Sequence, residues 1–99
     1  MNTPNLLQRV LDLTLQMEHA ARMSDWQSAA RVARERNPLL MSLGAPRTPE
    51  ARAAIERIRA ITVAINRDAD AARNELTAEY RAAMSRASGA SAYQRGAGF

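Results

Sequence analysis

Apolar and polar positions follow a helical period along most of the chain, and the longest unbroken pattern covers residues 49–86. The cap-and-proline pair Thr48-Pro49 marks its start. At ~1.5 Å rise per residue, such a helix would be about 55 Å long, so one end should outrun shorter neighbouring helices. Its apolar or small residues recur at steps of four and three, which indicates lengthwise packing against other helices: Ala51, Ile55, Ile58, Thr62, Ile65, Ala69, Ala72 and Leu76.

Two shorter helices are predicted before it, over residues 4–23 and 25–43. The first begins with the same type of start signal, Thr3-Pro4. Ser24 is predicted to cap the second helix in a capping box with Gln27. The connection is then very short, which favours an antiparallel hairpin.

Two residues decide how the second helix continues and ends. Pro38 removes a helical hydrogen bond and clashes with the preceding turn. We expect a kinked but nearly continuous helix, because the apolar stripe keeps its phase across the proline. The alternative is a new short helix capped by Asn37. Gly44 fits the first position beyond the helix end.

The sequence therefore predicts an all-α fold: an antiparallel three-helix bundle over residues 1–86, with a long third helix. Residues 87–99 are rich in Gly, Ser and Ala, which predicts a short C-terminal tail that is flexible or weakly helical. The side chains expected in the core are Leu7, Met17, Trp26, Leu40, Ile55, Ile58 and Ile65.

Composition narrows the function classes. The 99 residues fit one small domain, and the absence of Cys removes disulfides, thiolate nucleophiles and Cys-based metal sites. All cationic residues are Arg, but they alternate with acids, so the formal charge of +4 forms no basic face typical of DNA binders. No apolar run reaches the about 20 residues that span a bilayer, and the N-terminus lacks the pattern of a secretory signal. We expect a cytoplasmic protein without membrane insertion.

Catalytic templates are not met. The chain has no Gly-rich phosphate loop, and a single histidine, His19, offers no metal cluster. Asp68 and Asp70 are two positions apart on a helix and so point in different directions. We therefore expect no enzyme activity, no catalytic residues, no metal site and no cofactor.

A partner-binding surface is predicted on the later part of the third helix. Ala72, Leu76, Tyr80 and Met84 extend beyond the cover that the two shorter helices can provide, and an uncovered apolar strip marks an interaction site. Two other covers stay open: a second copy of the chain, which would give a homodimer, and the tail. Tyr93 and Phe99 are the large residues by which the tail would dock, in which case it would regulate access to the strip.

Several short motifs in the same order resemble the FliT-type flagellar type III export chaperones. A Leu-rich first helix is followed by Asp25-Trp26, and Glu35-Arg36 and Leu39-Leu40 lie in the second helix. Late in the third helix comes Arg73-x-Glu75-Leu76, and the chain closes with Ala92-Tyr93-x-x-Gly96-x-Gly98-Phe99. The resemblance covers nearly the whole chain.

The resemblance implies a chaperone that binds the flagellar filament-cap protein (FliD), prevents its premature assembly and delivers it to the export apparatus. It also implies contacts with the export ATPase complex and the export gate. Relatives can restrain the flagellar master transcription regulator, but we do not infer this for a chain with so short a C-terminal segment. Two other classes stay open: a basic helical regulator- or nucleic-acid-binding module, and a structural coiled-coil subunit.

Overall fold

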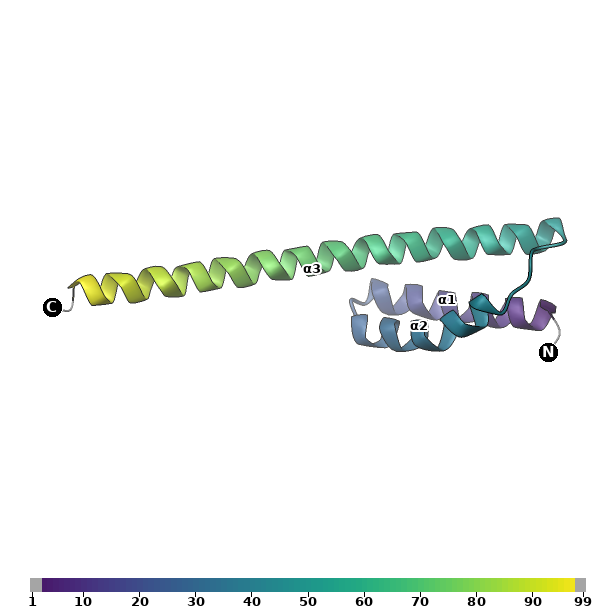
Figure 1. Ribbon diagram of the computed structural model, residues 1–99, viewed down its shortest axis with the longest axis horizontal. Helices are drawn as coiled ribbons and strands as arrows, with labels where there is room; N and C mark the ends of the chain where they lie inside the picture. Colours follow the sequence, from purple (N-terminus) through teal and green to yellow (C-terminus); the bar gives the residue numbers. More distant parts are fainter. Residues whose placement is uncertain (1–2, 98–99) are drawn as a thin grey trace. The chain divides into compact units, whose positions relative to one another are not determined.

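Three helices make up the part of the chain that the structure describes. The structure is a computed structural model, which describes the backbone of residues 3–97 and the side chains of residues 5–89. The helices are α1 (Thr3–Arg22), α2 (Trp26–Met41) and α3 (Pro49–Ala97), and no strand occurs between residues 3 and 97 (Figure 1). The predicted all-α class is confirmed.

The chain divides into two compact units. Unit 1 is Met1–Ala69 and holds α1, α2 and the beginning of α3. Unit 2 is Asp70–Phe99 and contains the remainder of α3, up to Ala97. The division therefore falls within one continuous helix.

A tight turn joins α1 to α2 as a helical hairpin, and the two helices lie side by side in Figure 1. The predicted capping box at Ser24 is wrong. Ser24 adopts a φ of 57°, the left-handed conformation needed to reverse the chain, and an N-cap residue does not have this geometry. Asp25 caps α2 instead, since its Oδ1 accepts a hydrogen bond of 3.1 Å from the backbone N–H of Ser28.

Helix α2 runs through Pro38 without interruption, as predicted, so a separate helix starting at Asn37 is wrong. It ends at Met41, earlier than the predicted residue 43, and Ser42 is the C-cap. The Ser42 backbone N–H and its hydroxyl both donate to the carbonyl of Pro38, at 3.2 and 3.0 Å. The C-cap Ser42 has right-handed helical backbone angles, and no left-handed glycine follows it. Gly44 is therefore not the residue that ends the helix.

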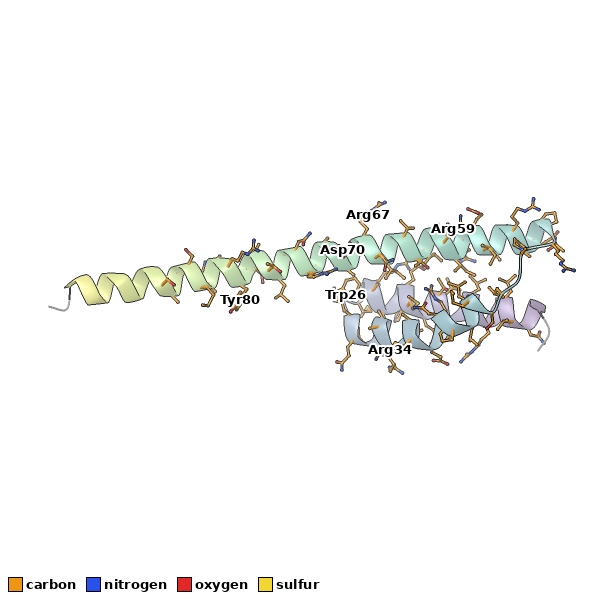
Figure 2. All side chains as sticks on the ribbon, in the orientation of Figure 1. Trp26, Arg34, Arg59, Arg67, Asp70 and Tyr80 are labelled. Carbon is orange, nitrogen blue, oxygen red and sulfur yellow. The ribbon has the colours of Figure 1, made fainter. Side chains whose placement is uncertain are left out.

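The core of unit 1 is formed by side chains from all three helices. Of the predicted core residues, Met17, Ile58 and Ile65 are buried, while Leu7, Trp26, Leu40 and Ile55 are half-buried. Trp26, at the turn end of the hairpin in Figure 2, packs against the core cluster. Between residues 5 and 89, the other buried apolar side chains are Val10, Leu13, Ala20, Ala29 and Val32.

The contact between α3 and the hairpin differs in type from the contact between α1 and α2. The backbones of α1 and α2 approach closely, whereas α3 meets the hairpin mainly through its side chains. Among the α3 side chains up to residue 89, the buried ones are Ile58 and Ile65. Burying two such side chains contributes roughly 3–6 kcal/mol, to which half-buried residues such as Ile61 add a smaller share.

Helix α3 does not end at Arg86, where the sequence predicted the start of a tail. It continues through Gly89 to Ala97. Ser88 and Ala90 flank Gly89, and one glycine in a helix interior costs only about 1 kcal/mol relative to Ala. That cost is too small to end a helix without a proline or a competing contact.

Candidate functional site

The predicted partner strip lies on unit 2. Ala72, Leu76, Tyr80 and Met84 follow each other at intervals of four residues on α3, so consecutive members are surface neighbours. Each step of four rotates by about 40° beyond a full turn, and the strip therefore winds gradually around the helix.

The strip is strongly exposed. The exposed fractions are 67% for Leu76, 65% for Tyr80 and 49% for Met84, while Ala72 is half-buried. Of the side chains that the structure describes, the other exposed large apolar ones, Met23, Met41 and Val63, occur singly. Isolated exposed apolar residues are normal on protein surfaces, but a row of them marks a contact surface.

Polar side chains border the strip. Arg73 forms an ion pair with Asp70 one turn earlier on the same helix, and both are exposed. Glu75, Glu79 and Arg81 are also exposed beside the strip. An apolar centre with a charged border is the usual composition of a protein-binding site. Tyr80, whose side chain extends from α3 in Figure 2, adds a hydroxyl that can hydrogen-bond at the edge of a contact.

The predicted tail residues cannot be placed in this way. The backbone at Tyr93 is part of α3, but its side chain lies outside the described residues, and Phe99 lies outside them entirely. Their regulatory role stays a prediction.

A second feature, in unit 1, was not predicted from the sequence. Arg36 of α2 is only 3% exposed, and its guanidinium contacts Thr14 of α1 and Thr62 of α3. Burial lowers the pKa of Arg36 below its ordinary value, because the charged guanidinium is partly removed from water. The sequence contained a signal for this, because Ala29, Val32 and Arg36 are spaced at i, i+3 and i+7 on one helical face.

Unit 1 also contains a mainly apolar cleft of about 730 Å³. It lies between the first turns of α1, the loop after α2 and the beginning of α3. Leu7, Leu11, Leu43 and Ile55 contribute its large aliphatic walls, and each of them is half-buried. This cleft is a second apolar surface that a partner side chain could enter.

Within residues 3–97, no helix is long and apolar enough to cross a membrane. Among the side chains described, no group of three or more His, Cys, Asp or Glu residues is placed to hold a metal ion.

Comparison with known protein families gives a match. The family described as "Flagellar protein FliT" matches residues 4–95, which is nearly the whole chain. Searches of curated proteins and of solved structures find no match. The helical architecture and the coverage of the match agree with the motif resemblance. The chain belongs to the FliT family of flagellar export chaperones.

Proposed function

We propose that this chaperone binds the flagellar filament-cap protein in the cytoplasm, prevents its premature assembly and delivers it to the type III export apparatus. Family membership supports the flagellar role. The observation that carries the binding proposal is the exposed strip of Leu76, Tyr80 and Met84, with half-buried Ala72 at its beginning.

The strip has the chemistry of a helix-binding surface. An amphipathic helix places apolar side chains at intervals of three and four residues, and these can lie along the matching row on α3. Burial of the row removes apolar area from water on both partners, which is the main driving force of such an association. Helices that assemble a filament cap would expose the same type of apolar face, so covering it prevents self-association.

Binding of this type requires no catalytic step. The chaperone shields its cargo by occupying an apolar face, and it releases the cargo when a tighter partner competes. We propose that the export ATPase complex and the export gate are the later partners. The antiparallel three-helix bundle belongs to the same proposal, as the scaffold that leaves one face of α3 available.

A homodimer is the principal competing use of the strip. A second copy of the chain would bury Leu76 and Tyr80 without any cargo. A structural coiled-coil subunit would form such an oligomer stably, whereas a chaperone should exchange it for the cargo. The two roles therefore differ in what happens when the cap protein is added.

The proposed function can be tested by mixing the purified chain with the purified filament-cap protein. Size-exclusion chromatography with light scattering should show a complex, and self-assembly of the cap protein should slow. A cap protein that lacks its C-terminal helix is the matched control and should neither bind nor be shielded. Unchanged self-assembly of the intact cap protein, with a chaperone oligomer that persists beside it, would favour the structural subunit.

A further inference from the structure

The guanidinium of Arg36 joins the three helices of unit 1. Its Nη1 donates to Thr14 Oγ1 of α1 at 3.2 Å and to Thr62 Oγ1 of α3 at 2.8 Å. On α2 itself, Asn37 Oδ1 accepts from Nε at 3.2 Å and from Nη2 at 2.9 Å. One side chain thus contacts both other helices through the same nitrogen.

Both threonines connect the guanidinium to the backbone in the same way. Thr14 Oγ1 donates to the carbonyl of Val10 at 2.8 Å, and Thr62 Oγ1 donates to the carbonyl of Ile58 at 2.7 Å. Each hydroxyl proton is therefore used within its own helix, and each oxygen accepts from Arg36. Every buried polar side-chain atom in the described region has a hydrogen-bond partner.

Removing Arg36 and removing Thr62 should have different effects on the hydrogen bonds of this cluster. If Arg36 were apolar, both hydroxyls would still donate to their own helices, and no buried donor would lose its partner. If Thr62 were apolar, a buried charged N–H would lose its acceptor, which is unfavourable. The guanidinium of Arg36 therefore requires the hydroxyl of Thr62 as an acceptor, whereas the hydroxyl of Thr62 has a hydrogen-bond partner even without Arg36.

The charge of Arg36 is also expensive to bury. Its acceptors are two hydroxyls and an amide, and no carboxylate of a described residue pairs with it. Neutral acceptors compensate a buried cation less well than a carboxylate does. If α3 moved away from the hairpin, water would reach the side of the guanidinium that now faces Thr62.

We propose that Arg36 is a polar latch between the hairpin and the first part of α3. In the closed state, its bond to Thr62 fixes the position along α3 that faces α2. In the open state, hydration of the guanidinium offsets part of the apolar contact that is lost. Arg36 therefore specifies one packing position of α3 on the hairpin and also lowers the free-energy cost of dissociating α3 from it. Dissociation exposes the apolar face formed by Leu13, Met17 and Val32.

The modest α3 contact makes such opening accessible. Helix α3 contacts the hairpin through two buried isoleucines, a few half-buried side chains such as Ile61 and this one hydrogen bond, while α1 and α2 pack closely along each other. Local opening of a weakly held element, with the remainder folded, is measured by amide hydrogen exchange.

Hydrogen exchange by NMR on the full chain tests the latch. Arg36→Met replaces the cation by an apolar side chain of similar length. The protection of α3 amides between residues 55 and 66 should rise about tenfold, the equivalent of about 1.4 kcal/mol. Amides of α1 and α2 should be protected at least as well as in the wild type.

Two further variants provide the controls. Arg34→Met removes an exposed arginine from the same helix, labelled in Figure 2, and should leave α3 protection unchanged. Thr62→Val should lower α3 protection about tenfold or more, and adding Arg36→Met should restore it. Equal or lower protection in Arg36→Met would overturn the proposal, as would loss of helicity by circular dichroism in that variant.

Discussion

Arg36 of α2 donates a 2.8 Å hydrogen bond to Thr62 of α3, and this bond joins a nearly fully buried cation to a neutral hydroxyl. The bond defines which turn of α3 faces the hairpin. The stability of unit 1 therefore depends on a residue pair that is neither an ion pair nor an apolar contact.

Thr62→Val should lower the free energy of unfolding by ~1–3 kcal/mol, because a buried guanidinium N–H loses its acceptor. In an Arg36→Met background, the same change should cost less than about 0.5 kcal/mol, since no donor is then left unpaired. Urea denaturation of the four proteins in this cycle gives both values. Thr77→Val, an exposed threonine on the same helix, is the control. Equal costs of Thr62→Val in the two backgrounds would show that the hydrogen bond is not the cause.

Ile58→Ala should reduce the free energy of unfolding by ~2–5 kcal/mol. The side chain is 2% exposed and is one of the two buried side chains in the described part of α3, so truncation leaves a cavity. Val63→Ala, on an exposed position of the same helix, should change stability by less than about 0.5 kcal/mol. Similar losses in both variants, measured by urea denaturation, would mean that Ile58 is not packed as described.

Asp25 predicts a specific dependence of stability on pH. Its pKa is lowered from the ordinary 3.8, chiefly by the hydrogen bond from Ser28, with Arg31 adding to it. Because the folded-state pKa is the lower one, the stabilisation is present above pH 3.8 and is lost as the pH falls through the folded value. Asp25→Asn keeps a capping oxygen but removes the titration. The difference in melting temperature between wild type and Asp25→Asn should therefore narrow in this acidic range, and a constant difference between about pH 2 and 7 would contradict the assignment.

Gly89→Ala should stabilise the end of α3. Gly89 is helical, its φ is not positive, and a Cβ at this position would meet no atom within 4 Å apart from its chain neighbours and the nearby backbone of its own helix. The change should therefore favour the helix by about 0.5–1 kcal/mol. NMR chemical shifts around residue 89 should become more helical. Unchanged shifts together with unchanged thermal melting would mean that the helix does not depend on this position.

The sequence predicted well the features that depend on a regular pattern. The start of α3 follows from Thr48-Pro49, and Thr48 Oγ1 indeed accepts from the backbone N–H of Ala51 at 3.0 Å. The period of the apolar residues also identified Ile58 and Ile65 as buried. These features are local or repeat many times, so no single competing contact changes them.

The wrong predictions concern places where the backbone conformation of one residue, or the free-energy cost of one residue type, determines the local structure. Ser24 has the right chemistry for a cap, but the reversal of the chain requires it to be left-handed, and the cap moves to Asp25. The glycines after Arg86 suggested a tail, although each weakens a helix by only about 1 kcal/mol. Arg36 was missed because a charged residue is usually assigned to the surface, and its acceptors come from two other helices.

The partner strip was predicted from residue types and spacing, and the exposure of Leu76 and Tyr80 supports a binding role without identifying the partner. The central claim is that the strip binds the filament-cap protein. Leu76→Ala and Tyr80→Ala should each keep the wild-type melting temperature, because more than half of each side chain is already exposed to water.

The most direct test is isothermal titration calorimetry with a C-terminal fragment of the filament-cap protein. Leu76→Ala and Tyr80→Ala should each weaken binding by more than ~1 kcal/mol, which is about fivefold or more in Kd. Val63→Ala, which changes an exposed apolar residue outside the strip, should bind like the wild type. If both strip variants bind the fragment as tightly as the wild type, the strip is not the cargo site and the account is contradicted.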